Sequence, residues 1–104
     1  MAIQCTRRSE YTEQETTRQI LNYLERRQVF AWRNNTGRRG RVSYGLKGSA
    51  DIIGILPGGR FLAIEVKVPG KKPSEEQMVF LQRVAEKGGL AIIAYSVDDV
   101  ITSL

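Results

Sequence analysis

The hydrophobic positions of the chain change their period along its length, and the changes predict alternating helices and strands. A segment from about 12 to 27 carries apolar residues at helical spacing. Its inward-facing positions are Ile20, Leu21 and Leu24. Thr12 and Glu15 have the T-x-x-E spacing of a capping box, in which the glutamate folds back on the first backbone N–H. The segment is therefore predicted to be a helix that begins near Thr12.

Four shorter runs are rich in β-branched, aliphatic and aromatic residues, as strands are. They span residues 29–34, 50–56, 60–68 and 90–96. Only Pro57, Gly58 and Gly59 separate the second run from the third, and this connection predicts an antiparallel hairpin. Residues 35–48, between the first run and the second, are basic and rich in glycine, so we predict a loop there.

A second helix is predicted from Ser74 to about Lys87, where two glycines end it. Ser74 and Gln77 again have capping-box spacing. Residues 97–104 predict a short final helix. The order of the core elements, α-β-β-β-α-β, indicates an α/β fold with a mixed sheet, in one domain that covers residues 1–104.

The charge of the chain favours an anionic partner. Sixteen lysines and arginines against eleven aspartates and glutamates give a net charge of +5, which is weak evidence for nucleic acid by itself. The distribution adds more, because basic residues crowd the Gly-rich stretch while most acidic residues lie on the predicted helices. The crowded residues are Arg33, Arg38, Arg39, Arg41 and Lys47.

The residue types that the chain lacks exclude several kinds of chemistry. With no histidine and a single cysteine, Cys5, it has no Ser-His-Asp or Cys-His catalytic set and no thiolate metal site. An intramolecular disulfide is impossible, and a reducing compartment is expected. No signal-peptide core and no run of about 18 apolar residues is present, so we expect a cytoplasmic protein with no membrane partner.

Charged residues interrupt the apolar pattern of the third strand. Alternation places Glu65 and Lys67 on one face of this strand and its aliphatic neighbours on the other. The hairpin brings Asp51, at the start of the preceding strand, beside Val66 and diagonal to Glu65. Two carboxylates and one ammonium group are therefore expected to converge.

Neighbouring carboxylates stay ionised at low cost only when a cation lies between them. Mg²⁺ and Mn²⁺ prefer oxygen ligands, so we expect either ion to be held by Asp51, Glu65 and the Val66 carbonyl. Lys67 would orient or help to deprotonate an attacking water, as in phosphodiester hydrolysis. Spacing alone also fits a simpler interpretation, a Glu65–Lys67 ion pair on a solvated sheet face and an Asp51 that merely starts a strand.

Other candidate residues each have a structural alternative. Glu13 projects on the apolar face of its helix, where a carboxylate needs a partner or a metal, whereas Glu15 points almost opposite. Gln77 is either a helix cap or a residue near the site. The basic stretch is either a solvated connector or a phosphate-binding surface. Tyr44, within it, is either a rim aromatic or a platform on which bases stack.

Three motifs in this order resemble one known family. Lys47-Gly48-Ser49-Ala50-Asp51 precedes the hairpin, Glu65-Val66-Lys67 follows it, and P-G-K-K-P-S-E-E-Q spans residues 69–77. Together they resemble the VRR-NUC family of the PD-(D/E)xK nuclease superfamily, from about Thr12 to Val100. Ala50 stands where the family usually has proline, which is not a ligand. The resemblance implies a restriction-endonuclease-like core.

The resemblance also implies roles for the matching residues. Asp51 and Glu65 match the metal-binding residues of the family, and Lys67 matches its catalytic lysine. Gln77 matches the glutamine that follows the ExK strand. Glu13, contacting the metal through water, matches the glutamate of the first helix better than Glu15, which the predicted capping box occupies.

Stand-alone members of bacterial and phage type resemble homodimeric, structure-specific endonucleases that cut branched DNA, including four-way (Holliday) junctions. We therefore expect a Mg²⁺- or Mn²⁺-dependent endodeoxyribonuclease in the cytoplasm of a bacterium or a phage-infected cell. Phosphate contacts are expected from Arg38, Arg39, Arg41, Lys47, Lys71 and Lys72. Two alternatives stay open, a non-catalytic DNA-binding module and a sequence-specific restriction-type endonuclease.

Overall fold

The computed structural model describes residues 11–104 except 36 and 40, and for residues 37–39 and 42–44 it describes the backbone. Cys5 lies outside this part of the chain. The elements are α2 (Glu13–Arg26), β1 (Phe30–Arg33), β2 (Gly37–Arg39), β3 (Val42–Tyr44), β4 (Ile52–Ile55), β5 (Phe61–Val66), α3 (Glu75–Glu86), β6 (Leu90–Ala94) and α4 (Val97–Ser103). The mixed α/β class predicted from the sequence is confirmed.

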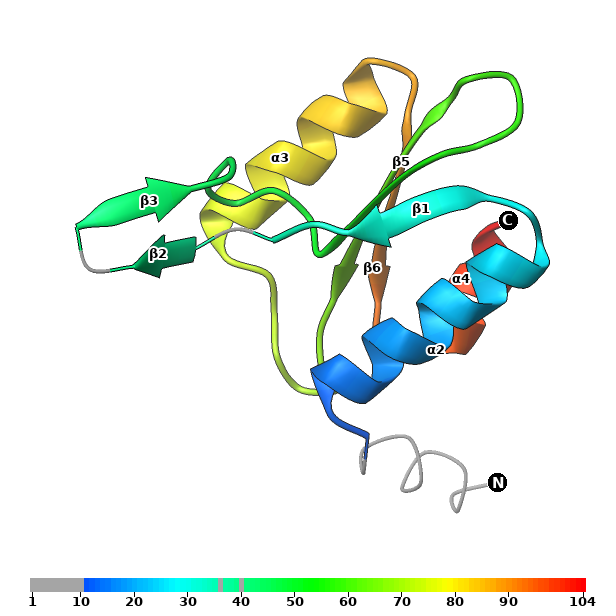
Figure 1. Ribbon diagram of the computed structural model, residues 1–104, viewed down its shortest axis with the longest axis horizontal. Coiled ribbons are helices and arrows are strands. Elements are labelled where there is room, and N and C mark those ends of the chain that lie inside the picture. The colour runs from blue at the N-terminus through cyan, green and yellow to red at the C-terminus, as the bar shows by residue number, and fades with distance from the viewer. Residues whose placement is uncertain (1–10, 36, 40) are drawn as a thin grey trace.

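Four strands form the central sheet, in the order β1-β4-β5-β6 (Figure 1). β1 pairs antiparallel with β4, and β4 pairs antiparallel with β5. β6 pairs parallel with β5, and α3 makes the crossover that two parallel neighbours require. The sheet is therefore mixed, with β1 and β6 at its edges.

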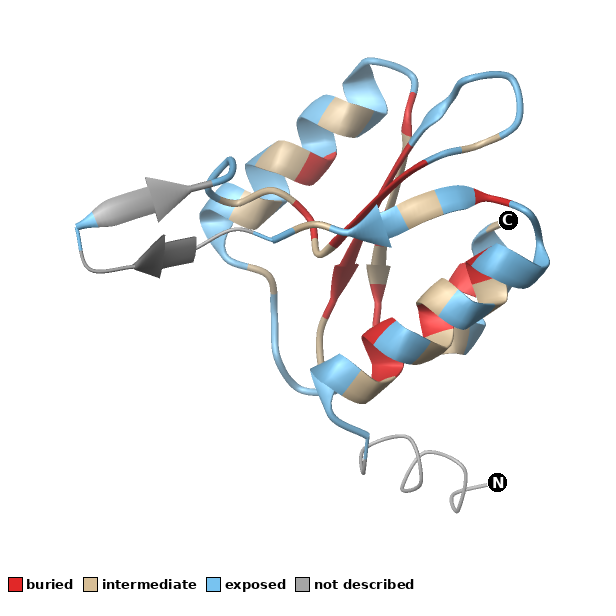
Figure 2. Ribbon diagram, viewed as in Figure 1, coloured by how far each residue is buried: buried red, intermediate tan, exposed pale blue. Residues whose placement is uncertain are grey.

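β5 lies between two hydrophobic cores, because its successive side chains point to opposite faces of the sheet. On one face its aliphatic residues pack against Ile20 of α2 and Val100 of α4. These strand residues are Leu62, Ile64 and Val66. On the other face, Ala63 shares a core with Leu81 of α3. Figure 2 shows buried residues along the middle of the sheet and on the inner side of α2.

Both long helices begin at their predicted capping boxes. The Thr12 side chain accepts a hydrogen bond from the Glu15 N–H at 3.0 Å, and the Glu15 carboxylate accepts one from the Thr12 N–H at 2.9 Å. Ser74 and Gln77 make the same pair of bonds at the start of α3. No helix among the described residues is long and apolar enough to cross a bilayer.

The prediction of a loop over residues 35–48 was wrong in part, because β2 and β3 form a separate two-stranded antiparallel sheet there. This hairpin projects from the body of the molecule beside the N-terminal end of α3 (Figure 1). Strands of three residues carry too little apolar alternation to be recognised by period. One signal was present, since Gly40-Arg41 is a two-residue Gly-X connection of the kind that joins tight hairpins.

Candidate active site

The carboxylate of Glu65 lies under α3 near the end of β5, and 1% of the residue is exposed. Its Oε2 accepts a hydrogen bond from Gln77 Nε2 at 2.8 Å. Its Oε1 is buried and has no hydrogen-bond partner among the described residues. A buried carboxylate oxygen without a donor is unfavourable, so this position is suited to a cation or a proton.

Asp51 lies in the bend before β4, and it is half-buried. Its Oδ2 accepts a hydrogen bond from the Val66 N–H at 2.8 Å, which fastens the carboxylate to the end of β5. The pairing of Ile52 with Ile64, continued by one residue, brings Asp51 opposite Glu65. The two acidic residues predicted to converge therefore do so across the β4–β5 hairpin.

The predicted hairpin register was wrong by one residue. Asp51 was expected opposite Val66 and diagonal to Glu65, which corresponds to a turn centred between Gly58 and Gly59. Ile55 instead pairs with Phe61, so the connection contains residues 56–60 and is centred on Gly58. The longer connection moves the acidic residues from a diagonal to a directly opposed position.

The pKa of Glu65 is raised from 4.5 to about 8. Burial is the largest cause, because it disfavours the charged form of the carboxyl group. The negative charge of Asp51 is next, together with a hydrogen bond that Asp51 can accept only from protonated Glu65. Lys67 opposes the rise and Glu13 adds to it. Burial and the neighbouring negative charge therefore favour the protonated form of Glu65 when no cation is bound.

Lys67 continues β5 in an extended path, where its N–H donates to the Ala94 carbonyl at 3.0 Å. Its Nζ lies 3.7 Å from Glu65 Oε2, and 18% of its side chain is exposed. The two residues share one face of the strand, as predicted. The simpler interpretation, a solvated surface ion pair, is contradicted because Glu65 is buried.

Gln77 has both of the roles that were treated as alternatives. Its Oε1 accepts a hydrogen bond from the Ser74 N–H at 2.7 Å, as the third residue of a helix does in a capping box. Its Nε2 donates to Glu65 at the same time. A side-chain amide can do this because it carries an acceptor and a donor on one rigid group.

The capping prediction is confirmed for Glu15, whereas the predicted placement of Glu13 is not. Glu15 is committed to the cap, and the hydrogen bond from the Thr12 backbone is the main cause that lowers its pKa. Glu13 is exposed, so its expected place on the buried face was wrong: the first turn of α2 extends past the core, whose buried positions begin at Thr16. Its charge still acts on Glu65, since it raises the pKa of that residue.

Asn34 was not found by sequence reasoning, and it positions Asp51. Its Nδ2 donates to Ser49 Oγ at 2.7 Å and to the Ala50 carbonyl at 2.9 Å. Its backbone N–H donates to the Asp51 carbonyl at 2.7 Å. These contacts tie the segment before β4 to the end of β1. The one sequence signal was an asparagine at the last position of the predicted strand over residues 29–34, where the backbone often needs a side-chain partner.

The donor set fits a hard divalent cation. The Val66 N–H points toward Asp51, to which it donates a hydrogen bond. In an extended strand the N–H and C=O of one residue point to the same side, so the Val66 carbonyl also lies on the side of Asp51. Glu65 Oε1, the Asp51 carboxylate and this carbonyl are all oxygens, which Mg²⁺ and Mn²⁺ prefer. No three acidic side chains within the described ranges come together as a metal cluster. Other coordination positions would fall to water and substrate, as is usual for Mg²⁺.

The basic residues expected to contact phosphate lie around one end of α3 and after β5. Lys47 is exposed and forms an ion pair with Glu76 at 3.4 Å, a surface contact that a phosphate could displace. Arg41, Lys71 and Lys72 are exposed. The remaining candidates lie on β2 and β3, for which the structure describes only the backbone. They are Arg38, Arg39 and Tyr44.

Comparison with known protein families identifies the family of this chain. The model of the VRR-NUC domain matches residues 3–98. The chain belongs to the VRR-NUC family. The resemblance of the three motifs is thereby confirmed, and this VRR-NUC chain is a nuclease domain with DNA as its substrate. A search of curated proteins finds no match to it.

Proposed function

We propose that the chain is a Mg²⁺- or Mn²⁺-dependent endonuclease that hydrolyses phosphodiester bonds of DNA. The observation that carries the proposal is Glu65 Oε1, a buried carboxylate oxygen that has no hydrogen-bond partner among the residues the structure describes. The negative charge of Asp51 acts on the same carboxyl group. Protein interiors rarely keep such an atom unless it has a function. A divalent cation would satisfy it and would remove the repulsion that raises the pKa of Glu65.

Asp51, Glu65 and the Val66 carbonyl would hold the ion, and Glu13 would contact it through water. When bound, the ion would neutralise the negative charge that develops on the phosphodiester during hydrolysis. The chain contributes by holding these oxygens in place before the ion arrives. Gln77 fixes Glu65 through its 2.8 Å hydrogen bond, and the Val66 N–H fixes Asp51 at the same distance.

Lys67 would position the attacking water. Its Nζ lies near Glu65 and its side chain is mostly buried, so its position is restricted before substrate binds. An ammonium group there can donate hydrogen bonds both to the water and to an oxygen of the phosphate under attack. It would also stabilise the charge of the transition state. Its loss is therefore expected to lower the rate more than the affinity for DNA.

Basic residues around the site, with Tyr44 among them, would bind the DNA backbone. Phosphate contacts position a duplex without reading its sequence, so DNA shape would be the basis of selectivity. The net charge of +5 supports an affinity that falls as salt rises. The residues assigned to this surface are Arg38, Arg39, Arg41, Tyr44, Lys47, Lys71 and Lys72.

Branched DNA, such as a four-way junction, is the proposed substrate, and a homodimer in the cytoplasm is the proposed working form. Support comes from the resemblance to stand-alone members of the family. A two-fold axis would place one site on each of two opposed strands, which is what symmetric cleavage of a junction requires.

Cleavage of labelled DNA tests the proposal. Duplex, flap, single-stranded and four-way-junction DNA are incubated with Mg²⁺, with Mn²⁺ or with EDTA, and Asp51→Asn is compared with Asp98→Asn, an exposed aspartate of α4. We expect metal-dependent cleavage by the wild-type chain and by Asp98→Asn, symmetric cuts in the junction, and no cleavage by Asp51→Asn. Binding without cleavage in every condition would favour a non-catalytic module, and cuts confined to one short sequence would favour a restriction-type enzyme.

A further inference from the structure

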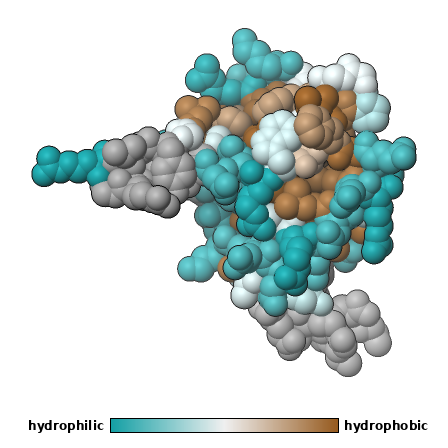
Figure 3. All heavy atoms as spheres, viewed as in Figure 1, coloured by the Kyte–Doolittle hydropathy of each residue, from teal (hydrophilic) through white to brown (hydrophobic). Residues whose placement is uncertain are grey.

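A cleft lies on the same face of the sheet as the active site, between the C-terminal half of α3 and the start of β5. Its volume is about 600 Å³, within the range of small-molecule sites. The lining residues are Leu46, Gly59, Arg60, Phe61, Phe80, Arg83, Val84, Lys87, Gly88 and Gly89. Figure 3 shows hydrophobic surface between α3 and the β4–β5 hairpin. Nothing in the metal site accounts for this cleft.

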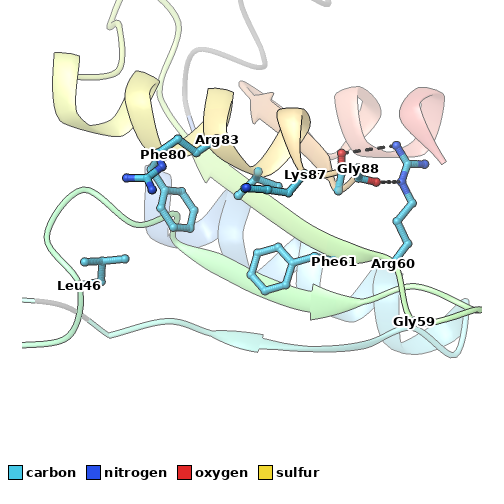
Figure 4. A pocket seen from close by; sticks show the side chains of 10 residues that line it. Leu46, Gly59, Arg60, Phe61, Phe80, Arg83, Lys87 and Gly88 are labelled. Carbon is cyan, nitrogen blue, oxygen red and sulfur yellow. Dashed lines mark hydrogen bonds between the residues drawn. The ribbon is translucent and has the colours of Figure 1, made fainter.

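Two phenylalanine rings form the apolar walls of the cleft. Figure 4 shows the Phe80 ring directly below α3 and the Phe61 ring farther along, over the strands. Phe61 is the first residue of β5 and is 41% exposed, so its ring is accessible from the cleft. Phe80 is half-buried and packs against the core beneath α3. An exposed ring beside a second, half-buried ring offers apolar surface to a flat group.

The polar residues at the rim are all basic. Arg83 and Lys87 are exposed and lie one turn apart on α3, so they project side by side. Arg60 is held at the end of the cleft, where its Nε donates to the Gly88 carbonyl at 2.8 Å (Figure 4). None of the lining residues is acidic. The cleft therefore combines an apolar interior with an anion-attracting rim.

The cleft is aligned with the active site. Phe61 and Glu65 are four residues apart on β5 and point to the same face, which separates them by about 13 Å. Along the axis of a duplex, one strand rises about 3.4 Å per nucleotide, so this separation corresponds to roughly four nucleotides of paired DNA. α3 covers the face between these two residues, because Ala63 is fully buried and packs with Leu81. A strand whose phosphate lies at Glu65 would therefore reach the cleft around α3.

We propose that the cleft binds an unpaired nucleotide of the DNA substrate, with its base against Phe61 and Phe80 and its phosphate near Arg83 and Lys87. This inference rests on the proposed function, because it takes DNA as the substrate. A base offers the flat apolar surface that the rings match, and the adjacent phosphate offers the negative charge that the rim matches. A flap carries unpaired nucleotides at its branch point, so the cleft would recognise the branch itself.

A second copy of the chain fits the cleft less well. In a two-fold contact the same surface is present on both subunits, so the basic rims would be brought toward each other without acidic residues between them. Like charges at such an interface oppose association. A nucleic acid instead brings the opposite charge to every basic residue.

Binding measurements in EDTA test the inference, because no metal-dependent cleavage occurs there. The affinity of the full chain is measured for a blunt duplex and for the same duplex with an unpaired tail of about five nucleotides. We expect the wild-type chain to bind the tailed DNA about tenfold more tightly. Phe61→Leu should abolish that preference and leave duplex binding unchanged. Phe30→Leu, at an exposed phenylalanine of β1 outside the cleft, should retain it.

A second variant and a second readout keep the test independent of folding defects. Arg83→Gln, a substitution at an exposed residue, should weaken tail binding and lower the salt dependence of binding by about one phosphate contact, while Arg26→Gln on α2 should not.

Equal preference for the tailed DNA in wild type, Phe61→Leu and Arg83→Gln would overturn the inference. So would a Phe61→Leu chain that sediments as a smaller species with unaltered DNA affinity, which would indicate a subunit contact. Tail binding without any metal-dependent cleavage would refute the proposed function and leave this inference standing.

Discussion

Gln77 joins the N-terminus of α3 to the carboxylate of Glu65, accepting a hydrogen bond from Ser74 with its oxygen and donating one to Glu65 Oε2 at 2.8 Å with its nitrogen. The amide is therefore held at both ends. Because the amide cannot turn without breaking both bonds, it fixes one oxygen of Glu65 and leaves Oε1 for another partner. Substitutions can distinguish the role of Gln77 in the helix cap from its role at Glu65.

Ser74→Ala and Gln77→Ala should differ in kind. Ser74→Ala removes the cap hydroxyl and keeps the contact with Glu65, so we expect a loss of about 1 kcal/mol in the free energy of unfolding and an unchanged kcat. Gln77→Ala also frees Glu65, so we expect a loss of about ten- to one-hundred-fold in metal affinity or activity. Urea unfolding and metal titration measure the two effects. Equal loss of activity in both variants would show that the cap, and not the contact with Glu65, is what matters.

Lys67→Ala should lose cleavage while binding DNA almost as well as the wild type. The ammonium group acts on the attacking water and the phosphate under attack, so we expect kcat to fall by about a hundredfold or more. Lys72→Ala, a nearby exposed lysine, should instead weaken binding and leave kcat intact. Single-turnover cleavage and binding in EDTA separate the two. Unchanged turnover of Lys67→Ala would remove Lys67 from the mechanism.

The stability of the metal-free chain should fall as pH rises. Glu65 has a pKa of about 8 when folded and of 4.5 as its ordinary value, so between these pH values the folded state binds a proton that the unfolded state has released. The stabilisation by this proton is complete below the lower pKa and is lost as pH rises through the upper one. We expect a decline of up to roughly 1 kcal/mol per pH unit in that window.

Glu65→Gln provides the matched control for this titration, because the amide has nearly the same shape and no charge. Its stability should vary less with pH than that of the wild type, and it should exceed the wild type at pH 8 in EDTA. Urea unfolding at pH 5 to 8 measures both chains. Parallel pH profiles would mean that Glu65 is already ionised, and the argument for a cation would lose its electrostatic basis.

Asn34→Ala should impair the metal site although Asn34 is not one of the residues that would hold the metal. The side chain holds Ser49 and Ala50, so its loss loosens the segment that carries Asp51. We expect metal affinity to fall by about tenfold, with kcat at saturating metal reduced less. Asn35→Ala, at the exposed neighbouring asparagine, should leave metal affinity unchanged. Identical titrations of the two variants would limit Asn34 to a structural role.

Much of the fold could be predicted because its signals are local. The capping boxes at Thr12 and Ser74 located the starts of both long helices, since each box needs two residues at fixed spacing. The pairing of β4 with β5 followed from a Pro-Gly-Gly connection. Its register did not, because one additional residue in the connection shifts every cross-strand pair.

The sequence predicted which residues form the site better than it predicted their burial and contacts. Glu65 and Lys67 could be assigned to one face because strand alternation is strict. The burial of Glu65 could not be read from its neighbours in sequence, since it depends on α3, which follows β5 in the chain. Asn34 escaped notice for the same reason: its partners lie 15 and 16 residues away, at the end of another segment.

Anomalous scattering from a crystal soaked in Mn²⁺ tests the central claim most directly. We predict one ion within about 2.6 Å of oxygens from Asp51, Glu65 and the Val66 carbonyl, with Glu65 Oε1 among them. Asp51→Asn crystals, soaked in the same way, should show a weaker peak or none. An empty site in the wild-type crystal, with the Asp51 and Glu65 side chains in the positions described above, would contradict the account.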